Sequence, residues 1–167
     1  TPTPTKVPLG PKKGKAIVPR EATQQEAPDL RHNRRKDRLI PASQPLPFLQ
    51  AVGIQTKDGR IRAAMQRKFK QLNQFLQLVD ATAEFDDFRQ RPLHVIDYGC
   101  GNAYLTFALT HYLTEIQGLE VTVDGVDVKE KLMARHNETA VSLDWPQVCF
   151  HPGTILAFQP EHPPDLV

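Results

Sequence analysis

The sequence predicts an α/β domain built on a doubly wound parallel sheet and preceded by a helical segment. Three observations support this fold class. From residue 93 onward, short apolar runs alternate with amphipathic stretches, as they do in β-α-β units. A Gly-x-Gly turn follows the first apolar run. The apolar content of 40% and the charged content of 24% are close to globular averages, so one packed core can form.

Residues 1–30 are expected to be a disordered, basic and proline-rich tail, because Pro, Lys, Thr and Gln dominate there without periodicity. Residues 31–92 are expected to form a helical N-terminal segment. Within it, Gly53 is placed to end a short helix around Phe48. Residues 60–80 have helical periodicity, because their apolar side chains fall on one face: Ile61, Met65, Leu72, Phe75, Leu76 and Val79.

Residues 93–167 are expected to hold three parallel strands, two helices and the beginning of a fourth strand. The run LHVIDY is short and almost continuously apolar, which is typical of a central parallel strand. The GCGN turn then leads into an amphipathic helix. The expected strands cover 93–98, 121–127, 147–151 and 164–167, and the expected helices cover 103–113 and 129–143.

The net charge of +2 conceals two regions of opposite charge. Residues 1–92 hold 18 Lys/Arg and 9 Asp/Glu, whereas residues 93–167 hold 3 and 10. A basic arm on an acidic domain suggests a polyanionic partner, although such an arm can also serve solubility alone. One candidate partner is RNA, held through a short basic stretch that contains Arg31, Arg34, Arg35, Lys36 and Arg38.

The composition gives no sign of a metal, a membrane span or an oxidising compartment. The two cysteines form neither a CxxC pair nor a zinc-binding spacing. No apolar run approaches the roughly 18 residues that a membrane span needs, and no signal peptide opens the sequence. A cytoplasmic location is therefore expected.

The segment DYGCGNA, residues 97–103, carries the clearest functional signal. It leaves a strand and enters a helix whose free N–H groups point into the crevice at the carboxyl ends of the strands. Gly99 and Gly101 allow the backbone to turn sharply and to approach a ligand closely. Cys100 and Asn102 belong to the same loop and are candidate cofactor contacts.

Two cofactors compete for this loop. A nicotinamide site usually has the pattern G-x-G-x-x-G/A, but Tyr104 stands at the final position and would crowd a pyrophosphate. Asp97, two residues before Gly99, can instead bind the cationic amino group of a methionine moiety, directly or through water. These residues therefore favour S-adenosylmethionine (SAM).

Two further elements are placed to bind a nucleoside. Asp127 ends the second strand, where a carboxylate can accept hydrogen bonds from both ribose hydroxyls. The loop after the third strand contains Gly153, Thr154 and Ile155, of which Ile155 could supply an apolar face for adenine. Each feature also has a purely structural interpretation: Asp127 could cap the next helix, and a Gly-x-Gly or a loop glycine could be only a turn.

In this order, DYGCGNAYLT and GVD resemble the first motif and the acidic strand end of class I SAM-dependent methyltransferases. The resemblance implies a Rossmann-like sheet of the class I type. A narrower resemblance covers residues 31–167: HNRRKDRLI, PLPFL and KFKQLNQFL, together with that loop, are similar to a bacterial methyltransferase-domain family related to the methyltransferase-like protein twenty-five group. Ala103 departs from the pattern, since many members have Gly there, and is expected to be tolerated as a small, helix-compatible residue.

The resemblance also implies that part of the domain, including its catalytic residues, lies outside this sequence. Class members usually have seven strands, so a chain ending at Val167 is expected to be truncated after the start of strand four, and inactive alone. The loop after that strand usually supplies catalytic groups, so no catalytic residue is assigned; His94 and His151 are expected to be structural. By resemblance, Lys68 and Gln71 are candidates to bind the carboxylate of the cofactor, although Lys68 can equally be a solvated helix charge.

The sequence therefore predicts a methyltransferase that uses SAM, with RNA as the first candidate acceptor. A protein or small-molecule acceptor is the alternative, in which case the basic arm would only aid solubility. A third hypothesis is a nucleotide-binding module without methyl transfer.

Overall fold

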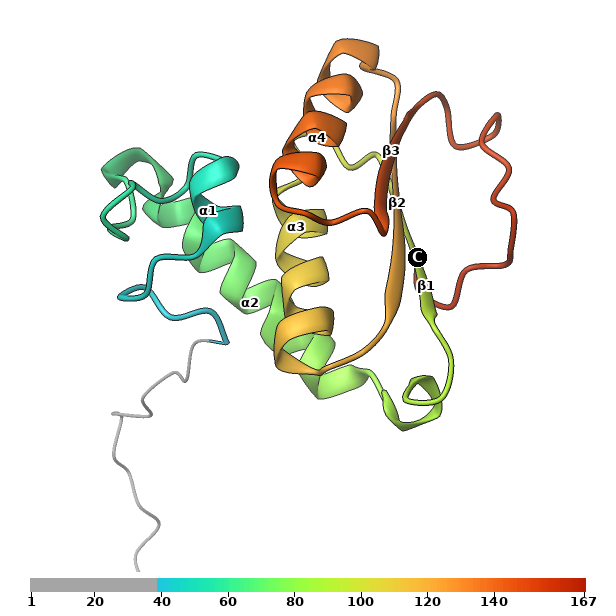
Figure 1. The fold of residues 1–167 in the computed structure, drawn as a ribbon, viewed down its shortest axis with the longest axis horizontal. Helices are drawn as coiled ribbons and strands as arrows, with labels where there is room; N and C mark the ends of the chain where they lie inside the picture. Colours follow the sequence, from blue (N-terminus) through green and yellow to red (C-terminus); the bar gives the residue numbers. More distant parts are fainter. Residues whose placement is uncertain (1–38) are drawn as a thin grey trace, which may run out of the picture. The chain divides into compact units, whose positions relative to one another are not determined.

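Three parallel strands form the sheet, in the spatial order β1-β2-β3 (Figure 1). The register places Asp97 of β1 opposite Gly125 of β2, and Asp127 of β2 opposite Pro152 of β3. The first two strands have their predicted bounds, and the third begins and ends one residue later than predicted. The strands are β1 Leu93–Tyr98, β2 Val121–Asp127 and β3 Val148–Pro152.

The computed structural model describes residues 39–167, which belong to the compact unit Lys36–Val167. The predicted tail and the basic stretch 31–38 lie outside the described residues, so both remain predictions. None of the helices within 39–167 combines the length and the apolar character that crossing a bilayer requires.

The predicted fourth strand is present as a single parallel bridge between Val95 and Leu166. The Ile96 N–H donates to the carbonyl of Leu166 at 2.9 Å, and the Leu166 N–H donates to the carbonyl of His94 at 3.2 Å. Because β1 pairs with β2 on its other side, this segment extends the sheet beyond β1. An ion pair between Arg91 and Asp165, 2.7 Å apart, fixes the start of the segment.

The helices are α1 Pro47–Ala51, α2 Gln66–Thr82, α3 Tyr104–His111 and α4 Glu130–Ser142, and a π-helical turn, Tyr112–Ile116, continues α3. Gly53 follows α1 with a φ of 75°, as predicted for a residue that ends a helix. The helix predicted for 60–80 was wrong at its start, because α2 begins only at Gln66.

Local hydrogen bonds explain the late start of α2. The buried side chain of Gln55 donates to the carbonyls of Gln44 and Gly59, at 2.8 and 2.7 Å. Thr56 donates its hydroxyl to the carbonyl of Arg60 at 2.9 Å, and Ile61 bridges back to Gln55. Side-chain bonds of this kind offer the backbone an alternative to the helix. A 3-10 turn, Ala63–Met65, then leads into α2.

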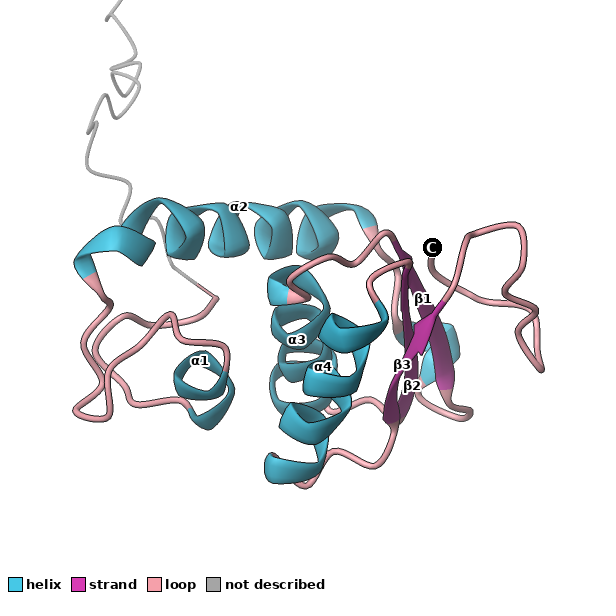
Figure 2. Cartoon of the chain, turned by 90° about the horizontal axis from the view of Figure 1, so that it is seen from above, coloured by secondary structure: helices cyan, strands magenta, loops and turns pink. Residues whose placement is uncertain are grey.

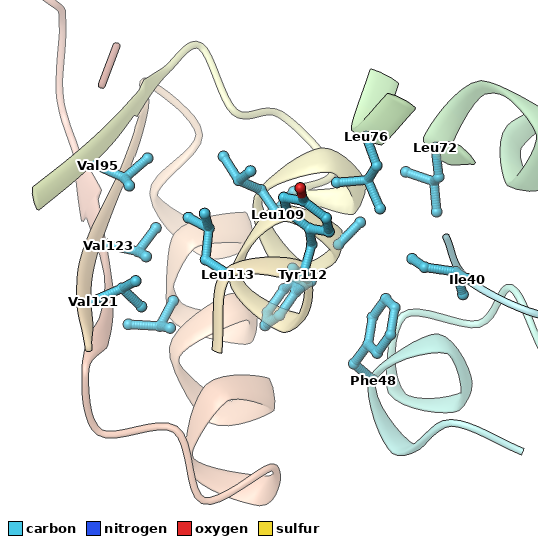
Figure 3. Packing of buried hydrophobic residues seen from close by; sticks show 14 of the residues in the cluster. Ile40, Phe48, Leu72, Leu76, Val95, Leu109, Tyr112, Leu113, Val121 and Val123 are labelled. Carbon is cyan, nitrogen blue, oxygen red and sulfur yellow. The ribbon is translucent and has the colours of Figure 1, made fainter. Parts of the chain in front are cut away.

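The helices that contact the strands, α3 and α4, lie against one face of the sheet, and α3 separates the sheet from α2 (Figure 2). Val95, Val123 and Val148 stand in register on this face and are buried. Val95 and Val123 face Leu109 and Leu113 of the α3 segment (Figure 3). Burying each of these side chains contributes about 1.5–3 kcal/mol, so this face adds substantially to stability.

The helical N-terminal segment shares the same core. Phe48 and Leu49 of α1 and Leu72 and Leu76 of α2 are fully buried and pack in one cluster with the residues of α3. Phe48 also stacks on the ring of His111, with ring centroids 4.7 Å apart. The segment therefore supports α3, the helix that follows the glycine loop.

Candidate functional site

The glycine loop folds onto the carboxyl end of β2. The N–H groups of Gly99 and Cys100 both donate to the carbonyl of Val126, at 2.7 and 3.2 Å. The loop leaves β1 and leads into α3, as predicted, and these two bonds place it across the end of β2, which was not predicted. Asp97 is the penultimate residue of β1 and Asp127 is the last residue of β2, so both lie at the carboxyl edge of the sheet.

Three residues of the loop have left-handed backbone. The φ angles are 74° at Gly99, 51° at Gly101 and 53° at Ala103. The prediction that the helix starts at residue 103 was therefore wrong, because Ala103 precedes α3 in a conformation that favours glycine. An L-residue in this region costs about 1–2 kcal/mol, which the burial of Ala103 partly offsets.

Asp127 connects the glycine loop to the start of α4. Its Oδ2 accepts a hydrogen bond from the N–H of Gly101 at 3.1 Å, and its Oδ1 accepts one from the N–H of Lys129 at 3.1 Å. The second bond spans two residues and orders the turn before α4. The capping role considered for Asp127 is therefore wrong, because the N-cap of α4 is Lys129 and no side-chain hydrogen bond caps this helix. The first bond holds the glycine loop against β2.

His136 contacts the carbonyl of the same glycine, Gly101. Its Nε2 lies 2.8 Å from this carbonyl oxygen, and its ring packs against Phe107 and Phe150. Burial lowers the pKa of His136 below its ordinary value, which favours a neutral ring that donates its Nε2–H to this carbonyl. No pattern in the sequence indicated this contact, since it joins residues 35 positions apart.

Asp97 is half-buried and faces α3. Its Oδ2 accepts a hydrogen bond from the hydroxyl of Thr106 at 2.5 Å. Burial raises the pKa of Asp97 above its ordinary value, and the bond from Thr106 opposes this shift. A cation placed beside Asp97 would relieve the cost of burying its charge, which is the role expected for the amino group of a methionine moiety.

A cleft of about 390 Å³ opens where the three strands end. Its volume falls within the usual range of ligand pockets. Three of its apolar side chains are unusually exposed: Val128 by 66%, Ile155 by 58% and Leu156 by 96%. The cleft brings together residues from the ends of all three strands, namely Gly99, Val126, Asp127, Val128, Gly153, Thr154, Ile155 and Leu156.

The family match agrees with this arrangement. The model of a family described as a methyltransferase domain matches residues 67–166. The chain belongs to this methyltransferase-domain family. A search of curated proteins found no match. The family accounts for the Rossmann-like character of the small parallel sheet and for a methyltransferase activity, and the narrower resemblance to the methyltransferase-like protein twenty-five group remains a prediction.

The cleft of this methyltransferase domain contains five of the predicted contact residues: Gly99, Asp127, Gly153, Thr154 and Ile155. Thr154 accepts two backbone bonds at its carbonyl, from Ala157 and Phe158, and so shapes the loop beside the cleft. Val126, Val128 and Leu156 were not predicted. An apolar residue directly after the acidic strand end was the one available signal for Val128.

The other predicted contact residues lie elsewhere. The thiol of Cys100 points into the core, 3.7 Å from the sulfur of Met133, and burial raises its pKa to about 12. Asn102 lines a separate cavity of about 220 Å³ beside α4. Lys68 bonds to Gln71 at 3.0 Å, and its Nζ lies 5.4 Å from the ring centroid of Tyr104, at the start of α3.

Neither Gly99 nor Gly101 is required by contacts within the protein. A Cβ at Gly99 would meet no atom within 4 Å, and one at Gly101 would meet only the carbonyl oxygen of Gly99, at 3.8 Å. Their positive φ angles and the open space beside them are therefore the two features that a side chain would disturb.

A larger cavity, of about 800 Å³, lies on the opposite face of the sheet. There Asp124 bonds to His94 at 2.9 Å and to His151 at 2.7 Å. Both imidazoles are thus engaged with one carboxylate, although the Nδ1 of His94 is buried without a partner in residues 39–167. In the described part of the chain no cluster of His, Cys, Asp and Glu could hold a metal ion.

Proposed function

We propose that this methyltransferase domain binds SAM in the cleft at the strand ends and transfers the methyl group of SAM to RNA. One observation supports the site above all others. Asp127, the glycine loop and three exposed apolar side chains converge on a single cleft in a member of a methyltransferase family. Exposed apolar residues are otherwise scattered on a protein surface, so their gathering here favours a bound apolar ring.

The cleft suits the adenosine part of SAM. The side chains of Val128 and Ile155 are both more than half exposed, so both can pack against the adenine ring. Each carboxylate oxygen of Asp127 accepts one backbone N–H and keeps a second lone pair free. Those lone pairs can accept the two ribose hydroxyls without disturbing the glycine loop.

The methionine part then extends toward the end of β1. Asp97 keeps Oδ1 for the amino group of the ligand, because Thr106 occupies only Oδ2. Lys68 lies beside Tyr104, the first residue of α3, and supplies a cation for the carboxylate. When bound, SAM supplies an activated methyl group, and the residues of this chain position the ligand and exclude water around it.

The acceptor is proposed as RNA because of the charge distribution. The basic stretch 31–38 would bind phosphates, and residues 93–167, which carry an excess of acidic side chains, would not. Five residues are proposed to contact the phosphates: Arg31, Arg34, Arg35, Lys36 and Arg38. Methyl transfer needs a base only if the acceptor must lose a proton first, and no base is proposed here.

Calorimetry with SAM and with its demethylated product tests the site. Both should bind, and NAD should not. Gly101→Val should abolish binding, because a β-branched residue cannot adopt a φ of 51° and would fill the open side of the loop.

Gly118→Val is the matched control. Gly118 also has a positive φ, 67°, and a Cβ there would meet no atom within 4 Å, but it lies in the turn before β2. It should destabilise the fold as Gly101→Val does and leave the affinity for SAM intact. Equal losses of affinity in the two variants, or none in Gly101→Val, would remove the support for the site.

A further inference from the structure

The approach to α2 carries a dense set of exposed cations. Between residues 57 and 70 the chain has six basic side chains and one acidic side chain, Asp58. Asp58 is paired with Arg60, at 2.6 Å. The side chains of Arg62, Arg67 and Lys70 are exposed and form no ion pair with any of residues 39–167.

These cations do not stabilise the helix. Neither the 3-10 turn Ala63–Met65 nor the first turn of α2 contains an acidic residue. The N-terminus of a helix has a partial positive charge, so acidic side chains are favoured there and cations such as Arg67 are unfavourable. A local preference that a sequence violates in this way indicates a use outside the fold.

The start of α4 shows the contrasting case. It also carries exposed basic side chains, at Lys129, Lys131 and Arg135. Acidic residues are interleaved with them, and Glu130 stands in the first turn of the helix, where the helix dipole favours it. The cations of α4 therefore belong to a mixed surface, whereas those of α2 form a surface of one sign.

Lys68 connects this surface to the proposed SAM site. Its side chain lies over the ring of Tyr104, which directly follows the glycine loop. Arg67 and Lys70, its neighbours on α2, are exposed, as is Gln71, which accepts a bond from Lys68. A ligand lying along the start of α2 would thus reach the region of the glycine loop.

We infer that Arg62, Arg67 and Lys70 form a docking surface for the phosphate backbone of the RNA that this domain methylates. This α2 surface rests on the proposed function, and it names where the acceptor binds. Long, flexible and unpaired cations suit a polyanion, since they bind phosphates without a shaped pocket. The neighbouring carboxamides of Gln71 and Gln74 can donate to phosphate oxygens as well.

The test compares two triple variants of the full chain that remove the same charge. One is Arg62→Gln/Arg67→Gln/Lys70→Gln on the α2 surface, and the other is Lys129→Gln/Lys131→Gln/Arg135→Gln on α4. Lys68 is left in place because it is proposed to contact SAM. Binding of a labelled RNA of about 20 nucleotides is followed by fluorescence anisotropy between about 50 and 300 mM salt.

The α2 variant should bind RNA roughly tenfold or more weakly at low salt, and the slope of log affinity against log salt should flatten by about 2, or about 0.7 for each lost phosphate contact on a single strand. Its melting temperature should be unchanged or slightly higher, because Arg67 no longer opposes the helix dipole. The α4 variant should retain most of its affinity and slope.

Several results would overturn the inference. Unchanged RNA binding in the α2 variant would do so, as would equal losses in both variants, which would indicate net charge alone. Displacement of RNA by polyglutamate as readily as by unlabelled RNA would indicate an acidic protein partner instead. A single-stranded DNA of the same sequence serves as a further comparison. If it binds as tightly as the RNA, the α2 surface binds phosphates but does not distinguish RNA from DNA.

Calorimetry with SAM separates this inference from the proposed function. If the wild-type chain and the α2 variant bind SAM equally and only RNA binding is lost, both proposals are supported. If SAM binds and RNA binding is insensitive to the α2 variant, the docking surface alone is wrong. If the wild-type chain fails to bind SAM, the proposed function is wrong whatever RNA does.

Discussion

Asp97 and Asp127 lie near the carboxyl ends of neighbouring strands of one sheet, yet their carboxyl groups have different surroundings. At the end of β1, Asp97 is half-buried against α3, bonded to Thr106, and its pKa is raised. At the end of β2, Asp127 accepts two backbone N–H groups and lines an open cleft. Burial therefore makes the charge of Asp97 costly, whereas the charge of Asp127 orders the glycine loop.

The difference explains how one edge of a sheet can bind the two ends of one ligand. A half-buried carboxylate selects a cation, because an opposite charge offsets the cost of its burial. A carboxylate held by backbone donors keeps a fixed orientation and spare lone pairs, which suits a pair of hydroxyl groups. Under the proposed function, these are the amino group and the ribose of SAM.

The packing beneath both residues gives the largest expected effect on stability. Gly125 lies opposite Asp97 and two residues before Asp127, and a Cβ there would lie 2.4 Å from the ring of Phe150 and 3.2 Å from the thiol of Cys100. Phe150 is buried against Phe107, so its ring has little room to move. Gly125→Ala should lower the free energy of unfolding by about 1–3 kcal/mol in denaturant titrations.

Gly153→Ala is the control for this effect. A Cβ at Gly153 would meet no atom within 4 Å, and its φ is not positive, so the free energy of unfolding should stay within about 0.5 kcal/mol of wild type. A loss at Gly153 as large as that at Gly125 would contradict the packing described beneath the strand ends.

Asp97 predicts a pH dependence of SAM binding. The amino group of SAM binds the ionised carboxyl, so affinity should be constant at higher pH and fall up to tenfold per pH unit once the pH drops below the raised pKa. Without ligand, the folding stability of the protein depends on pH in the opposite direction to the SAM affinity. A raised pKa favours the protonated folded state, so the contribution of Asp97 to stability is present at low pH and lost as the pH rises through that pKa.

Asp97→Asn should bind SAM more weakly and remove this acid limb from the affinity profile. Calorimetry between about pH 4 and 7 covers the range in which a raised carboxyl pKa lies. An acid limb that persists in Asp97→Asn would assign the titration to another group and break the contrast between the two strand ends.

Much of the fold could be predicted from the sequence, because its signals are local. LHVIDY and VTVDGVD are short apolar runs bounded by turns, and both strands have the predicted bounds. The glycine loop and Asp127 were predicted from their order along the chain. The start of α2 was not, since the bonds of Gln55 and Thr56 that delay it join residues across a turn.

The parts of the site that escaped prediction depend on tertiary contacts. The contact between His136 and Gly101 joins a helix to a loop from another part of the sequence. The inward turn of Cys100 follows from the space above Gly125, which the sequence does not reveal. The left-handed backbone of Ala103 is likewise imposed by the loop around it, against the preference of alanine.

The most direct test of the cleft measures SAM affinity and stability on one variant, Asp127→Ala. If Asp127 binds the ribose, affinity should fall by about 1.5–3 kcal/mol, the range for hydrogen bonds to a charged group. Stability should also fall, by about 1 kcal/mol for the lost bond to Lys129. A loss of stability with an unchanged affinity for SAM would mean that Asp127 only orders the glycine loop and the turn before α4, and would contradict the account.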